Sequence, residues 1–183
     1  EGISFLLIQI DTPGGRVDVL RDLVKSVLNS NIPVVTYVGP QGARSASAGT
    51  YLVLSSHVAA MAPATNIGSS TPVLIDGNEP TEDMRNKMVN DAAAYIRGLA
   101  TERGRNAEWA EQSVRDSVNI TSQEALDLNV IDFIASSIPD LLKQIDGKTV
   151  RLQNSEFVFT PSDAKLIDKS VTGNLTFSII WIV

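Results

Sequence analysis

The sequence predicts an α/β fold with a mostly parallel sheet and flanking helices. Strand-like apolar runs alternate with amphipathic helical patterns along the first 145 residues, an order typical of parallel sheets covered by helices. The first run, "ISFLLIQI", is apolar at nearly every position, as expected of a strand buried on both faces. With 183 residues, 43% of them hydrophobic, the chain can form one domain with a substantial core.

Composition excludes several classes of function. The net charge is −6 and the basic residues are scattered, whereas nucleic-acid binding needs clustered Lys and Arg, so we expect no nucleic-acid partner. The chain has no cysteine and a single histidine, His57. Disulfides, thiolate catalysis, Cys-ligated zinc and a His-rich metal site are therefore excluded, and we expect neither a metal nor a cofactor.

The first half of the chain predicts three strands separated by helices. The segment "TPGG" makes a sharp turn after the first strand, and residues 16–29 carry one apolar stripe, which indicates an amphipathic helix. A second strand, "IPVVTYV", precedes the loop "GPQGAR". We expect a buried helix of small residues from Ser45 and a short strand at "HVAAMA".

The second half predicts helices, one further strand and a small appended unit. Residues 64–81 are expected to form a long polar loop that covers the site, and residues 82–103 and "NAEWAEQSVRDS" two helices. Thr121 and Glu124 form a capping box at the start of another helix. "VIDFIA" predicts a strand, "IPDLLKQI" a helix, and "KTVRLQ" with "EFVFT" a hairpin.

These patterns divide the chain into a main domain (1–145), a segment of small appended strands or linker (146–171) and a terminal segment (172–183). Leu175–Val183 contains no charged residue. It predicts either a terminal strand or the first half of a membrane-spanning helix, which needs about 20 apolar residues. We favour the membrane helix.

Ser47, in "ASAG", is the candidate nucleophile. Small residues flank it where a helix is expected to begin, which resembles the G-x-S-x-G elbow with Ser45 in place of the first glycine. Gly14 and Gly15 follow the first strand and leave backbone N–H groups uncovered, as an oxyanion hole requires. Each pattern alone also fits simple close packing or an ordinary strand-to-helix turn.

A base must activate this serine. His57 is a poor candidate, because a strand beginning there would carry it away from the helix start that holds Ser47, so a Ser-His-Asp triad is not expected. A desolvated lysine is the alternative, because burial lowers its pKa. Among the six lysines, Lys87 is singled out by its place at the edge of an apolar helix stripe, beside Met84 and Met88.

Four motifs together resemble the N-terminal protease domain of NfeD-type proteins, membrane proteases encoded beside stomatin homologues. They are "QIDTPGG", "GARSASAGTYL", "MAPATNIGSSTPV" and "AAAYIRGLATERGRNAEWAE", and "TSQEALDLNVID" resembles the end of that domain. The resemblance covers about residues 3–145 and implies the ClpP/crotonase fold and a relation to the signal peptide peptidase SppA. The family fold begins with a further strand and helix, so an exposed strand edge is expected here.

The resemblance also implies a Ser–Lys dyad. By motif the nucleophile is Ser47 and the base is Lys87, eight residues before the tyrosine of "YIRGLA". Gly14 and Gly15, with the amide of Ala48, match the oxyanion-hole region, and which glycine donates stays open. The implied substrate is a hydrophobic segment of a stomatin-like membrane protein. The implied setting is a membrane-tethered homodimer with its protease domain on the extracytoplasmic side.

Three other functions remain open at this point. An SppA-like signal peptide peptidase would use the same chemistry on another substrate. A crotonase-like acyl-CoA enzyme would use the paired amides on a thioester enolate, without a nucleophile at Ser47. A non-catalytic scaffold would bind a stomatin-like partner without cleaving it.

Overall fold

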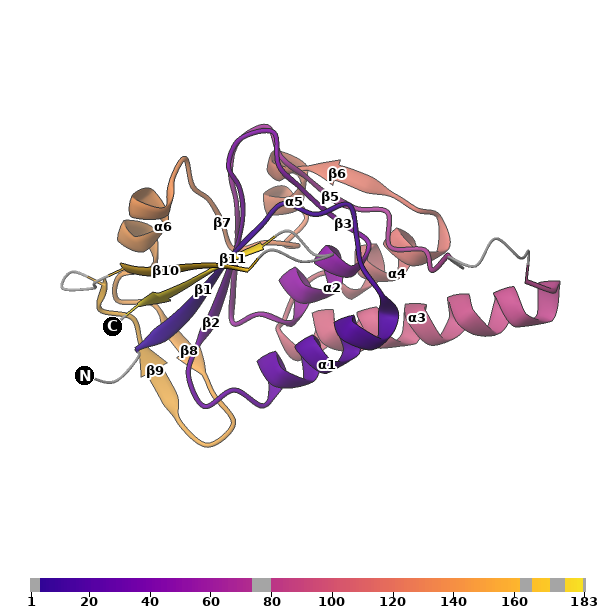
Figure 1. Ribbon diagram of the computed structural model, residues 1–183, viewed down its shortest axis with the longest axis horizontal. Helices are drawn as coiled ribbons and strands as arrows, with labels where there is room; N and C mark the ends of the chain where they lie inside the picture. The colour runs from indigo at the N-terminus through magenta and orange to yellow at the C-terminus, as the bar shows by residue number, and fades with distance from the viewer. Residues whose placement is uncertain (1–3, 74–79, 162–165, 172–176, 183) are drawn as a thin grey trace.

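A six-stranded sheet lies at the centre of the computed structural model, which describes residues 4–73, 80–161, 166–171 and 177–182 (Figure 1). The strand order is β10-β11-β1-β2-β4-β7, and the four strands from β1 to β7 are parallel. The α/β fold with a mostly parallel sheet is therefore confirmed. The six strands are β1 (Phe5–Ile10), β2 (Val34–Val38), β4 (Val58–Met61), β7 (Phe133–Ile134), β10 (Leu166–Val171) and β11 (Phe177–Ile182).

The helices cover both faces of this sheet, which explains the continuous apolar runs. Every residue of β2 and β4 is buried. One apolar core lies between the sheet and α1–α4, and a second lies between the opposite face and α6 with its neighbouring hairpin. The helices are α1 (Val17–Leu28), α2 (Ala48–Ser55), α3 (Glu82–Glu102), α4 (Ala107–Arg115), α5 (Ser122–Asp127) and α6 (Ile138–Ile145).

A small second sheet, in the order β3-β5-β6, lies beside the start of α2. Its strands are β3 (Arg44–Ala46), β5 (Asn66–Gly68) and β6 (Asn119–Thr121). The helix expected from Ser45 therefore begins only at Ala48, after a strand, and residues 66–68 of the expected polar loop are a strand. Three-residue strands carry too little periodicity to be detected in a sequence.

The appended hairpin is confirmed as β8 (Thr149–Arg151) paired antiparallel with β9 (Glu156–Val158). Val150 and Phe159 belong to the second core, so this unit packs directly against the sheet. The capping box of Thr121 and Glu124 is also present at the start of α5.

We favoured a membrane helix for residues 172–183, of which 172–176 and 183 lie outside the described residues. Residues Phe177–Ile182 form strand β11, which pairs antiparallel with β1 along its whole length. This was the alternative left open for the segment, and β11 also occupies the edge of β1 that we expected to be exposed. Among the helices in the described residues, none is long and apolar enough to span a membrane.

The long helix α3 runs along one side of the molecule, and its N-terminal end projects beyond the other elements (Figure 1). Residues 82–87 are all exposed, whereas Ala93, Ile96, Leu99 and Ala100 are buried. The Thr81 side chain accepts the N–H of Met84 and caps the helix. The fully buried residues of α3 therefore all lie in its C-terminal half.

Candidate active site

Ser47 occupies a strained position at the start of α2. Its φ is 52° and its ψ is −116°, a conformation that costs a residue with a side chain about 1–3 kcal/mol. This is the sharp strand-to-helix turn of a nucleophile elbow, with β3 on one side of the serine and α2 on the other. The structure thus gives Ser47 the local geometry that its small neighbours predicted.

Hydrogen bonds to Gly68 hold this turn in place. The Ser47 N–H donates to the Gly68 carbonyl oxygen at 3.0 Å, and the Thr50 hydroxyl donates to the same oxygen at 3.1 Å. The Thr50 hydroxyl also lies 2.9 Å from the Ser45 carbonyl oxygen. The neighbouring strand β5 therefore stabilises the strained conformation of Ser47.

The glycine loop after β1 lies directly against Ser47. A Cβ on Gly14 would stand 3.0 Å from the Ser47 Cβ and 3.3 Å from its Oγ, and Gly14 has a φ of +137°. Only glycine suits such a close approach in this conformation. The structure thus brings together Ser47, the candidate nucleophile, and the loop predicted to supply the oxyanion hole.

Two backbone amides at this place remain available to a ligand. Gly15 and Ala48 both line the cavity next to Ser47. Ala48 is the first residue of α2, so its N–H has no partner within the helix. Within the described part of the chain neither N–H donates to a protein acceptor, whereas the Gly14 N–H donates to the Thr12 hydroxyl at 3.1 Å.

A cavity of about 120 Å³ opens beside Ser47. An apolar cavity of roughly 150 Å³ holds a benzene ring, so this one has room for a single aliphatic side chain. Its walls come from α1, α2, α3 and the segment after β5: Val17, Leu20, Arg21, Tyr51, Ser70, Pro72, Met88, Asp91, Ala92 and Tyr95. We expected residues 64–81 to cover the site. Ser70 and Pro72 of this segment line the cavity, and residues 74–79 lie outside the described residues.

Polar groups of this cavity are mostly paired with one another. Arg21 forms an ion pair with Asp91 and lies over the Tyr95 ring, 4.6 Å from its centroid. Burial raises the pKa of Tyr51, so its hydroxyl stays protonated and donates to the Ser70 carbonyl oxygen at 3.3 Å. Most of the cavity wall is therefore suited to an apolar group.

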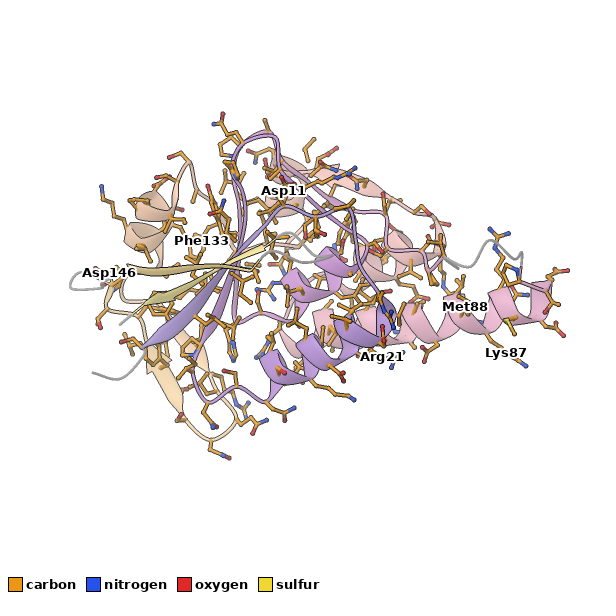
Figure 2. All side chains as sticks on the ribbon, in the orientation of Figure 1. Asp11, Arg21, Lys87, Met88, Phe133 and Asp146 are labelled. Carbon is orange, nitrogen blue, oxygen red and sulfur yellow. The ribbon has the colours of Figure 1, made fainter. Side chains whose placement is uncertain are left out.

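Lys87 does not lie against Ser47 in this structure. Its side chain is exposed on the projecting part of α3 and extends away from the body of the molecule (Figure 2). The next residue, Met88, lines the cavity, but Lys87 does not. We expected a desolvated lysine here, but no part of the chain that the structure describes buries the Lys87 side chain.

His57 lies at the opposite end of α2 from Ser47, following the C-cap residue Ser56. An eight-residue helix is about 12 Å long, which places the imidazole out of reach of the serine. Burial, with the charges of Arg103 and Arg105, lowers the pKa of His57 to about 4. Its Nδ1 accepts the Val34 N–H at 3.1 Å, a structural role.

Several residues that support the site were missed in the sequence. Arg105 binds the C-terminal end of α2, donating to the carbonyl oxygens of Leu54 at 3.0 Å and Ser56 at 2.8 Å, and also to Asp132 at 2.8 Å. Gly68 and Thr12 hold the nucleophile and the glycine loop. Thr12, Gly68 and Arg105 all fall within the family motifs, but no local pattern marks their role.

No cluster of three or more His, Asp or Glu side chains suited to a metal is present in the described parts of the chain. The cavity instead brings the Ser47 hydroxyl and the backbone of Gly15 and Ala48 together with mainly apolar side chains, beside the paired polar groups described above. This set can bind and polarise a carbonyl group next to a nucleophile.

Comparisons with known proteins find relatives of similar sequence and fold. A family model described as the N-terminal domain of NfeD1b matches residues 1–154. The membrane-bound protease PH1510 of Pyrococcus horikoshii is 43% identical over 180 residues, which cover 96% of this chain and 41% of that protein. The chain thus spans about two fifths of the length of this relative.

Two solved structures of 1510-N, described as a membrane-bound stomatin-specific protease, have a similar fold. A lysine-to-alanine variant in complex with a substrate peptide matches with a TM-score of 0.78 and 38% identity, over 86% of this chain and 73% of that chain. A serine-to-alanine variant matches with a TM-score of 0.74 and 41% identity, over 81% and 72%.

Proposed function

The chain belongs to the family of NfeD1b N-terminal domains, and on that premise we propose that it is a serine endopeptidase with a Ser47–Lys87 dyad. One observation carries the proposal: Ser47 has the strained backbone of a nucleophile elbow beside a cavity that Gly15 and Ala48 also line. A serine that served only to pack α2 would have no need of this conformation.

The chemistry follows from these groups. The Ser47 Oγ attacks the scissile carbonyl carbon, its proton passes to the neutral Lys87 amine, and the carbonyl electron pair moves to oxygen. The N–H groups of Gly15 and Ala48 stabilise that oxyanion. When the intermediate collapses, the C–N bond breaks and Lys87 protonates the leaving amine. Water then hydrolyses the acyl-enzyme, giving its proton to Lys87 and restoring the Ser47 hydroxyl.

Lys87 is proposed as the base because it adjoins the cavity residue Met88 and because a lysine variant of the relative 1510-N was studied with its substrate peptide. The amine must then turn from its exposed position toward Ser47 when a peptide occupies the site. A bound peptide would exclude water there and favour the neutral amine.

The proposed substrate is a hydrophobic segment of a stomatin-like membrane protein. The small apolar cavity would accept an aliphatic side chain next to the scissile bond, and the relative 1510-N is described as stomatin-specific. PH1510 is described as membrane-bound. Membrane tethering, an extracytoplasmic protease domain and a homodimer are part of this proposal.

The test compares wild type with Ser47→Ala and Lys87→Ala on a fluorogenic peptide of apolar residues, from mildly acidic to strongly basic pH. Lys143→Ala is the matched control, because this lysine is exposed on α6, which packs on the opposite face of the sheet. We expect cleavage by wild type and by the control, loss of cleavage in both dyad variants, and a rate that rises with pH along a single basic limb.

Other outcomes identify the rival functions. A Lys87→Ala variant as active as wild type would remove Lys87 from the mechanism. Turnover of acyl-CoA thioesters that survives Ser47→Ala would indicate a crotonase-like enzyme. Preference for cleaved signal peptides over stomatin segments would indicate an SppA-like peptidase. If the wild-type chain binds a stomatin-like protein but never cleaves it, the scaffold function replaces the protease.

A further inference from the structure

The backbone of Thr12 is fixed to the segment that carries Ser47. Its N–H donates to the Arg44 carbonyl oxygen at 2.8 Å, and its carbonyl oxygen accepts the Ala46 N–H at 3.1 Å. These two bonds form an isolated parallel bridge around Ser45, two residues before the nucleophile. Thr12 therefore has a defined place relative to Ser47.

The Thr12 hydroxyl holds both polar groups of Gly14. Its Oγ1 accepts the Gly14 N–H at 3.1 Å and donates to the Gly14 carbonyl oxygen at 3.0 Å. The side chain is 2% exposed, so water competes little for these bonds. The hydroxyl thereby fixes the position of a glycine that touches Ser47.

The bond to the Gly14 carbonyl oxygen has a consequence for the next residue. The Gly14 carbonyl and the Gly15 N–H belong to one planar peptide unit, in which oxygen and hydrogen point in opposite directions. Fixing the oxygen therefore fixes the direction of the Gly15 N–H. Two successive glycines would otherwise let this unit rotate easily.

We propose that Thr12 is a positioning residue, whose hydroxyl orients the Gly14–Gly15 peptide so that the Gly15 N–H joins the Ala48 N–H in the oxyanion hole. This inference rests on the proposed serine protease function. It also selects between the two glycines: the Gly14 N–H is occupied by Thr12, and the Gly15 N–H is left for the substrate.

Two variants of Thr12 separate the hydroxyl from the methyl group. Thr12→Val keeps the shape but removes the hydroxyl, and Thr12→Ser keeps the hydroxyl but removes the Cγ2 methyl, which packs closely over Gly49. Removal of an oxyanion donor costs roughly 10²–10³ in kcat. We expect Thr12→Val to lower kcat about 100-fold with little change in KM, and Thr12→Ser to retain most of the activity.

Thr36→Val is the matched control, because Thr36 is fully buried on β2 and its hydroxyl bonds to Ser56, away from the site. Thr36→Val should lower stability and leave kcat unchanged.

A peptide aldehyde gives a second readout. The Ser47 Oγ adds to the aldehyde carbon, and the aldehyde oxygen then occupies the position of the oxyanion. Thr12→Val should weaken this adduct in parallel with kcat, while an uncleaved peptide binds Ser47→Ala and the Ser47→Ala/Thr12→Val double variant equally.

Wild-type kcat in Thr12→Val, or equal losses in Thr12→Val and Thr12→Ser, would overturn the inference. So would a crystal structure of Thr12→Val in which the Gly14 carbonyl keeps its direction, and this readout needs no activity. If Ser47→Ala instead cleaves as well as wild type, Ser47 is not the nucleophile and the proposed serine mechanism fails, and the crystal structure still decides the role of Thr12.

Discussion

The Ser47 N–H donates a 3.0 Å hydrogen bond to the Gly68 carbonyl oxygen, which links the proposed nucleophile to strand β5. Gly68 has a φ of +135°, and a Cβ there would stand 2.2 Å from the Val118 carbonyl oxygen. No side chain fits between these backbones. The placement of Ser47 therefore depends on a glycine 21 residues later in the sequence.

Gly68→Ala should lower the free energy of unfolding by about 3 kcal/mol or more and abolish peptide cleavage, because strain and the backbone clash displace β5. Chemical denaturation and a cleavage assay measure both effects. Gly98→Ala is the control: an added Cβ meets nothing within 4 Å on α3, and this variant should gain about 0.5–1 kcal/mol. An active Gly68→Ala variant of normal stability would contradict the role given to β5.

Gly14→Ala should remove activity with a smaller loss of stability. The added methyl would lie 3.0 Å from the Ser47 Cβ and would displace the serine or the glycine loop, whereas the core is untouched. We expect kcat to fall at least about 100-fold, as for a lost oxyanion donor. Gly42→Ala carries a similar backbone strain, with φ +86°, but no neighbour within 4 Å, so it should keep wild-type kcat.

Arg105→Met should destabilise the fold by about 3–5 kcal/mol, because it leaves Asp132 and the carbonyl groups at the end of α2 without their buried partner. Urea denaturation measures the loss. Arg16→Met removes an ion pair whose two side chains are each 63% exposed, so its urea midpoint should stay close to that of wild type. Equal effects of the two variants would show that Arg105 does not anchor α2.

His57 should make stability depend on pH in the mildly acidic range. Its folded-state pKa of about 4 lies below the ordinary value of 6.5, so the unfolded chain takes up a proton first. Stability is therefore complete above about pH 6.5 and decreases as the pH falls toward 4, by about 2 kcal/mol between pH 7.5 and 5. His57→Gln should remove this decrease in urea denaturation series, and an unchanged pH dependence would contradict the assignment.

Much of the fold is predictable because long apolar patterns decide it. The runs that became β1, β2 and β4 and the stripes of α1 and α3 are set by burial, which the sequence records directly. Strands β3, β5 and β6 are held by hydrogen bonds between distant segments. Residues such as Asn66 and Asn119 carry no sign of that pairing.

The candidate site likewise contains residues that local sequence patterns reveal and residues that they do not. Ser47, Gly14 and Ala48 are recognisable because a nucleophile elbow and a glycine turn are local in sequence. Thr12, Gly68 and Arg105 act through bonds to partners far along the chain or through the direction of one peptide unit, which no spacing rule expresses. The sequence could not separate a membrane helix from strand β11 at Phe177–Ile182, because a short apolar run has no periodicity that distinguishes the two.

The backbone conformation of Ser47 lowers the stability of the domain while it presents the hydroxyl proposed for catalysis. Glycine adopts φ 52° and ψ −116° without strain, whereas serine does not. Ser47→Gly should therefore unfold at a higher temperature than wild type and lose all cleavage. Selection for stability alone would replace this serine. The strained conformation thus costs the domain about 1–3 kcal/mol and keeps a hydroxyl beside the cavity.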